Sequence, residues 1–190
     1  MIFDIKLGEN FSRKARLVGG GHTTAATYSI KLSSVVSRDS VRIDLTIAEL
    51  NELDILACDI QNKYLTELCR EKMWTFAGPE FGEEEGTLML VKMALYGLKS
   101  PGAAFRSNLE GLMKDIGNLS TKGDPDVYIR PAVKPDGTEY HEMVLCYVDN
   151  VLAISATPMK TIEGIKAVFK LKGDKVEVPD TYLVVSIQKV

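Results

Sequence analysis

The chain has 190 residues, of which 45% are hydrophobic and 26% are charged, and its formal net charge is −3. A chain of this length and balance can bury a hydrophobic core, which excludes a disordered or collagen-like protein. It contains no apolar run of about 18 residues or more, and its first residues lack the order of a signal peptide. We therefore expect a soluble intracellular domain with no membrane partner.

The charge is unevenly distributed along the chain. Residues 1–42 carry seven basic and three acidic side chains, so this segment is +4 and the remainder is −7. A basic arm on an acidic body suits a protein that binds phosphates beside a carboxylate-rich, metal-dependent site. An ordinary solvated surface can show the same asymmetry, and charge alone leaves both interpretations open.

The N-terminal elements are the least determined by the local sequence. Residues 8–34 are rich in Gly, Ser and Thr, which predicts a mobile basic hairpin or loop region. Residues 41–47 alternate strictly between apolar and polar side chains, and this period favours a strand. Ser40 as a cap and the unbroken continuation through Leu50 favour a helix over 38–52 instead.

The rest of the chain predicts strands and helices that alternate. Residues 54–60 are an apolar run typical of a buried strand. The helix that starts at Ser100-Pro101 has serine as cap, proline at its first position and an apolar face, and Gly117 ends it. The further expected elements are strands at 73–76 and 88–93, a hairpin of 127–133 and 139–148, a tight hairpin over 145–154, a helix over 157–169 and a strand at 181–188. From residue 54 onward this order is roughly β-α-β-β-α-β, which fits an α+β fold with ferredoxin-like layers.

Two aspartates in this order are candidate metal-binding residues. Asp59 ends one apolar strand, and Asp149 lies in a tight turn between two others. In a ferredoxin-like sheet the first strand and the central hairpin are neighbours, so both carboxylates can meet at one edge. Carboxylates held close together on rigid strands repel each other unless a divalent cation neutralises them. Mg²⁺ is suited to this role. Aspartates at strand ends are also ordinary turn formers, so spacing alone does not decide.

Five stretches together resemble the reverse transcriptases of copia-type LTR retrotransposons. Leu-Tyr-Gly-Leu-Lys is specific to that group, and Tyr-Val-Asp-x is the polymerase catalytic turn. The stretches follow the family's order and spacing: 14–18 (Lys-Ala-Arg-Leu-Val), 34–38 (Ser-Val-Val-Ser-Arg), 59–65 (Asp-Ile-Gln-Asn-Lys-Tyr-Leu), 95–100 (Leu-Tyr-Gly-Leu-Lys-Ser) and 147–150 (Tyr-Val-Asp-Asn). The resemblance covers residues 11–190, after an N-terminal extension at 1–10. It implies fingers at about 11–36 and 67–99, a palm at about 37–66 and 100–190 with a ferredoxin-like core, and no thumb, RNase H or integrase. It also supports the helix over 38–52.

The resemblance implies an RNA-directed DNA polymerase, in which a primer 3′-hydroxyl attacks the α-phosphate of a dNTP. Asp59 and Asp149 resemble the metal-binding carboxylates, the Ile60 carbonyl is a possible further ligand, and Asn150 stands in the catalytic turn. The implied cofactor is Mg²⁺, for which Mn²⁺ is a possible substitute, and the implied partners are dNTPs and an RNA or DNA template with its primer. Family location implies cytoplasmic virus-like particles, with the nucleus as an alternative. The sequence does not indicate an oligomeric state.

The remaining site residues are also implied by the resemblance. Tyr64 resembles the aromatic residue that lies under the deoxyribose, where a packed ring leaves no room for a 2′-hydroxyl. The other expected nucleotide contacts are Lys14, Arg16, Lys63, Tyr96 and Gly97, and the expected nucleic-acid contacts are Arg38, Lys99 and Tyr147.

Three residues depart from the family pattern. Asn150 replaces the second aspartate of the catalytic turn, which removes one of three carboxylates. Lys63 stands where a small residue is usual, so its stem either crowds the nucleotide pocket or points away from it. Val184 replaces a glycine near the end. These departures leave open an alternative function, a catalytically inactive module that binds nucleic acid or protein.

Overall fold

The computed structural model describes residues 2–6, 12–20, 34–69, 72–182 and 185–187. The chain forms two compact units, which are described separately below. The first unit consists of Met1–Leu32 and Asn62–Phe105, and the second of Ser33–Gln61 and Arg106–Val190.

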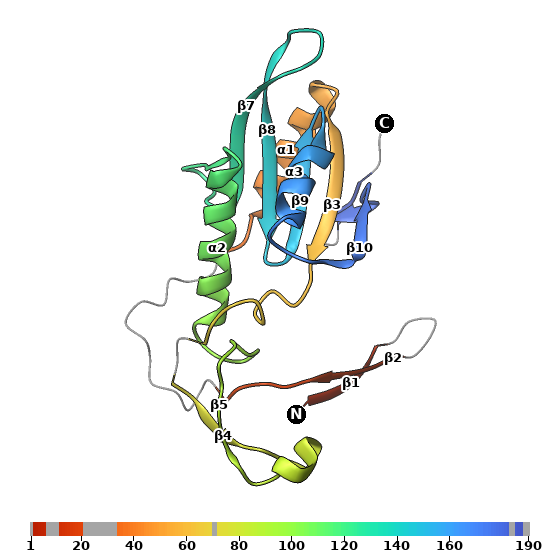
Figure 1. The fold of residues 1–190 in the computed structure, drawn as a ribbon. Helices are drawn as coiled ribbons and strands as arrows, with labels where there is room; N and C mark the ends of the chain where they lie inside the picture. The colour runs from red at the N-terminus through yellow and green to blue at the C-terminus, as the bar shows by residue number, and fades with distance from the viewer. Residues whose placement is uncertain (1, 7–11, 21–33, 70–71, 183–184, 188–190) are drawn as a thin grey trace. The chain divides into compact units, whose positions relative to one another are not determined.

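The second unit is built on a six-stranded sheet in which every neighbouring pair is antiparallel. Its spatial order is β10-β3-β9-β8-β7-β6 (Figure 1). The strands are β3 (Asp54–Ile60), β6 (Leu119–Ser120), β7 (Val127–Val133), β8 (Glu139–Tyr147), β9 (Asn150–Ser155) and β10 (Leu171–Glu177). The predicted strands at 54–60, 127–133 and 139–148 are therefore confirmed, as is the tight hairpin over 145–154.

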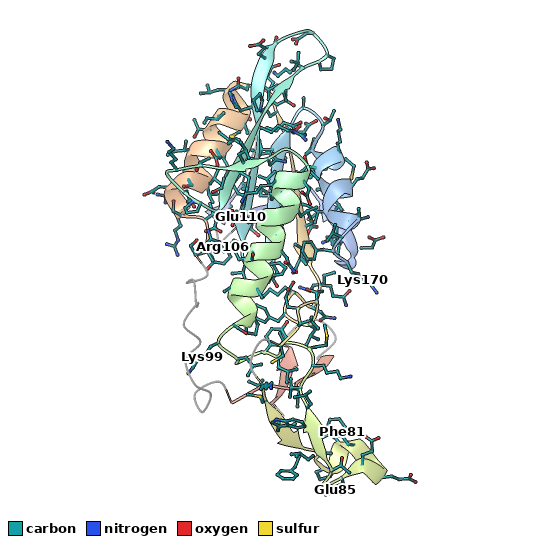
Figure 2. All side chains as sticks on the ribbon, turned by 60° about the vertical axis from the view of Figure 1, so that its left-hand side comes forward. Phe81, Glu85, Lys99, Arg106, Glu110 and Lys170 are labelled. Atoms are coloured by element: carbon teal, nitrogen blue, oxygen red, sulfur yellow. The ribbon has the colours of Figure 1, made fainter. Side chains whose placement is uncertain are left out.

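Three helices cover the two faces of this sheet. Helix α1 (Arg38–Leu50) lies on one face, and α2 (Pro101–Asp115) and α3 (Pro158–Lys166) lie on the other (Figures 1 and 2). On the α1 face the core contains Leu145, Leu152 and Ile154, all of them fully buried. Packing on both faces makes β8 and β9 the most buried strands, which gives the β8–β9 turn a rigid support.

Residues 38–50 form a helix, so the strand indicated by the alternating pattern is wrong. The Ser37 hydroxyl caps this helix by accepting a hydrogen bond of 3.0 Å from a backbone N–H. The buried residues of α1 are Val41, Asp44 and Ala48, which are three and four positions apart. These three positions form the buried stripe of a helix, but the middle one is an aspartate. The apolar side chains at 41, 43, 45 and 47 therefore alternate with polar ones, which is the pattern of a strand.

The C-terminal part also differs from the sequence-based expectation. Strand β10 was not expected, and it occupies the sheet edge next to β3. The single strand expected at 181–188 is wrong, because β11 (Thr181–Tyr182) and β12 (Val185–Ser186) pair with each other. The helix expected over 157–169 ends at Lys166. Val184 lies outside the described residues.

The first unit contains two small antiparallel ribbons. Strand β1 (Ile2–Lys6) pairs with β2 (Ser12–Arg16), so part of the region expected as an extension joins the predicted basic hairpin. Residues 7–11 and 21–33 of that region lie outside the described residues. Strand β4 (Trp74–Phe76) pairs with β5 (Leu88–Leu90), with a 3-10 helix, η1 (Pro79–Glu84), between them. Within the described ranges, no helix is long and apolar enough to cross a membrane.

Candidate active site

The sheet register of the second unit brings the candidate catalytic residues together. Strands β3 and β9 are neighbours, and Asp59 lies directly opposite Asn150. One residue further, the backbone N–H of Ile60 donates a 2.8 Å hydrogen bond to the carbonyl oxygen of Asp149. Asp59, Asp149 and Asn150 therefore lie together at one end of two adjacent strands, as the expected strand order indicated for the two aspartates.

The turn that carries Asp149 is conformationally restricted. Tyr147 pairs with Asn150 across the hairpin, so the loop consists of Val148 and Asp149 alone. The backbone φ of Val148 is 58°, a left-handed conformation that a β-branched residue adopts at a cost of about 1–3 kcal/mol. Two-residue hairpin loops need positive φ at the first loop position, which explains why Val148 is held there. The turn thus fixes the backbone of Asp149 at the tip of the hairpin.

Asp59 forms an ion pair that the sequence did not predict. The ammonium Nζ of Lys172 lies 2.7 Å from Oδ2 of Asp59. Lys172 is on β10 and follows Leu171, which pairs with Ile60 of β3. This strand was missed because the sequence from Leu171 to Glu177 is mostly charged and contains a Gly-Asp pair, which is typical of a turn.

The donor set at this end of the sheet is suited to Mg²⁺. Asp59 and Asp149 supply carboxylate oxygens and Asn150 an amide, and oxygen ligands are the ones that Mg²⁺ prefers. The Lys172 ammonium group is already paired with the Asp59 carboxylate. Within the described residues, no group of three or more His, Cys, Asp or Glu side chains is arranged to hold a metal ion.

The thiols behind the site are not candidates for its chemistry. Burial chiefly, and then the negative charge of Asp59, raises the pKa of Cys58 to about 11. Cys146 is buried as well, and burial raises the pKa of its thiol strongly. Both thiols are therefore protonated at neutral pH, and a protonated thiol is a poor nucleophile.

Two of the expected nucleic-acid contacts lie on the second unit in different environments. Arg38 is exposed at the first position of α1. Tyr147 is half-buried and packs against the core on the α1 face, so its side chain contributes to the packing of the hairpin. Lys99, the third, is half-buried in the first unit.

In the first unit, Tyr64 and Tyr96 lie against each other. Their ring centroids are 5.0 Å apart with an interplanar angle of 67°, an edge-to-face contact. The Lys63 ammonium lies 4.9 Å from the centroid of the Tyr64 ring, and Lys63 is buried. The Lys63 cation therefore lies over the face of the Tyr64 ring.

Gly97 allows a close backbone approach within the first unit. Its φ is 85°, and a Cβ atom there would lie 2.5 Å from the carbonyl oxygen of Gly19. The N–H of Gly19 donates a 2.7 Å hydrogen bond to the carbonyl oxygen of Tyr96. Any larger residue than glycine would separate these segments. Lys14 and Arg16 lie on β2, and their side chains are outside the described structure.

Comparisons with known proteins agree with the resemblance found in the sequence. The family model of reverse transcriptase (RNA-dependent DNA polymerase) matches residues 3–189. The "Retrovirus-related Pol polyprotein from transposon RE1" of Arabidopsis thaliana is 26% identical over 166 residues. That match covers 84% of this chain and 11% of the polyprotein, so the chain spans a small part of its relative.

Proposed function

Because the chain belongs to the reverse transcriptase (RNA-dependent DNA polymerase) family, we propose that it is the fingers and palm of a copia-type polymerase that extends a primer with dNTPs. The observation that carries this proposal is the register that sets Asp59 opposite Asn150 in the turn of Asp149. This register supports the proposal, because it sets Asp59 beside the hairpin loop that carries Asp149.

We assign the palm to the second unit and the fingers to the first. In the second unit β3, most of α2, β8, β9, α3 and β10 follow in this chain order, with β6 and β7 inserted before β8. These four strands lie side by side in the order β10-β3-β9-β8. This arrangement, with helices on a fully antiparallel sheet, supports a ferredoxin-like palm. The proposed fingers at about 11–36 and 67–99 overlap the first unit, which consists of Met1–Leu32 and Asn62–Phe105.

In the proposed mechanism the primer 3′-hydroxyl attacks the α-phosphorus of the dNTP, and the bond to pyrophosphate breaks. The carboxylates of Asp59 and Asp149 would hold Mg²⁺ or Mn²⁺, and the Ile60 carbonyl is proposed as a further ligand. When bound, the cation supplies positive charge that stabilises the attacking and leaving oxygens. The strained turn at Val148 keeps Asp149 in place, so little reorganisation is needed when the substrates bind.

The nucleotide contacts are part of the same proposal and rest on the family pattern. Tyr64, which packs edge-to-face with Tyr96, is proposed to exclude a 2′-hydroxyl by occupying its space. Lys14, Arg16, Lys63 and Gly97 complete the proposed nucleotide set, and Arg38, Lys99 and Tyr147 the template and primer set. Cations of this kind offset the charge of phosphates.

Asn150 is proposed to lower the rate of synthesis. An amide carries no charge, so the site has one negative charge fewer with which to attract and hold the cation. By analogy with removal of one group that stabilises a transition state, the loss amounts to about 10²-fold. We further propose that the chain acts in the cytoplasm or nucleus as part of a longer polyprotein.

The proposal is tested by primer extension on an RNA template with Mg²⁺ and with Mn²⁺. The unmodified chain is compared with Asn150→Asp, and binding of the primer–template duplex is measured for both. We expect Asn150→Asp to raise synthesis by about 10²-fold at similar duplex affinity. Duplex binding with no synthesis by either protein would instead support the inactive binding module.

A further inference from the structure

The ion pair between Lys172 and Asp59 has a consequence for metal binding. We propose that Lys172 is an internal competitor, a tethered ammonium group that holds the Asp59 carboxylate and must be displaced before a divalent cation binds there. This inference rests on the proposed function for the identity of that cation. The pair itself, at 2.7 Å, is a property of the second unit alone.

The irregular edge strand explains how Lys172 reaches Asp59. Leu171 pairs with Ile60, and the next paired residue of β10 is Val176, opposite Cys58. The chain thus advances five residues on β10 against two on β3, and the excess forms a bulge. Gly173 and Asp174 take left-handed φ values of 63° and 54° inside it. Lys172 begins this bulge, immediately after the residue that pairs next to Asp59.

Lys172 pairs with Asp59, whereas two neighbouring lysines pair with other carboxylates. Lys166 pairs with Asp174 at 2.9 Å, and Lys175 pairs with Glu177. These two lysines of the same region are thus engaged with carboxylates outside the site. Lys170, labelled in Figure 2, is exposed and precedes the bulge.

The exposure of the pair allows exchange rather than permanent closure. The Lys172 side chain is 62% exposed and that of Asp59 is 29% exposed. An ion pair of this exposure is weak, and it reduces the apparent affinity of a competing cation by a factor of about two to five. The effect matters more here because Asn150 leaves Asp59 and Asp149 as the remaining carboxylates of the proposed site.

The test measures Mn²⁺ binding to the full chain by the loss of the electron paramagnetic resonance signal of free Mn²⁺. Lys172→Gln is compared with Lys175→Gln, which removes an equal charge from the same strand but leaves Asp59 paired. We expect Lys172→Gln to bind Mn²⁺ about two to five times more tightly than the unmodified chain. Lys175→Gln and the conservative Lys172→Arg should remain close to the unmodified chain.

The outcomes separate this inference from the polymerase proposal. Equal Mn²⁺ affinities of Lys172→Gln and Lys175→Gln would overturn the competition, and so would weaker binding by Lys172→Gln. If Asp59→Asn abolishes Mn²⁺ binding while Lys172→Gln changes nothing, the metal site stands and only the competition fails. If Asp59→Asn binds Mn²⁺ as well as the unmodified chain, the metal site itself is wrong, and the competition with it.

Discussion

Asp44 is a buried carboxylate that should make the stability of the second unit depend on pH. The residue is 7% exposed, and its Oδ2 atom has no hydrogen-bond partner among the described residues. Burial chiefly, and then the negative charge of Asp124, raises the pKa of Asp44 to about 6. Asp124 stays ionised, because hydrogen bonds from Ser37 and Ser40 outweigh the effect of its own burial and lower its pKa.

The pKa of Asp44 sets the direction and size of the effect. An unfolded aspartate has a pKa of about 3.9, so the folded chain holds this proton more tightly than the unfolded chain. The contribution to stability is therefore fully present below about pH 4 and is lost as pH rises through about 6. Each pKa unit corresponds to about 1.4 kcal/mol, so the loss between pH 4 and pH 7 is at most about 3 kcal/mol.

The substitution Asp44→Asn tests this reasoning, because an amide resembles the protonated carboxyl and does not titrate. The free energy of unfolding is measured in urea at several pH values between 4 and 7.5. The advantage of Asp44→Asn over the unmodified chain should grow by about 2–3 kcal/mol across this range. Glu49→Gln, an exposed position on the same helix, should show no such growth, and a constant difference for Asp44→Asn would refute the reasoning.

Three further substitutions test other parts of the second unit by urea denaturation. Val148→Gly should raise the free energy of unfolding by about 1 kcal/mol, because glycine adopts a φ of 58° without strain, and a decrease would contradict the strained turn. Asn118→Leu should raise the free energy of unfolding by about 1–2 kcal/mol, because both polar side-chain atoms of Asn118 are buried without partners in the described structure. A lower free energy of unfolding would indicate that these atoms do form hydrogen bonds. Arg130→Met should lower it by about 3 kcal/mol or more, because the buried Glu142 carboxylate loses its ion pair, and a neutral result would contradict that pairing.

The sequence predicted those elements of the second unit whose local signals agree with their place in the fold. The hairpin of β7 and β8 has a Pro-Asp-Gly turn, β9 is an apolar run that is almost entirely buried, and β3 is a largely apolar run that is mostly half-buried. Because these strands are neighbours in a sheet of this order, the approach of Asp59 to the Asp149 turn could also be predicted. These are the positions where pattern and packing require the same residues.

The sequence failed where a polar residue occupies a structural position. On α1 the buried stripe contains Asp44, so the helical period was hidden. Strand β10 pairs with β3 only at its ends, and its bulge consists of charged residues and Gly173, which locally indicate a turn. Lys172 could not be assigned to Asp59 because the strand that carries it was not expected. Register, rather than composition, brings these two side chains together.

The most direct test of the central claim is single-nucleotide incorporation by Asp149→Asn, made in the Asn150→Asp background, with duplex affinity measured in parallel. If Asp149 holds the catalytic cation, this variant should lose about 10²-fold or more in incorporation rate. Its affinity for the primer–template duplex should stay unchanged, because the proposed duplex contacts are made to phosphates by residues other than Asp149. Equal incorporation rates with and without the Asp149 carboxylate would contradict the proposed active site.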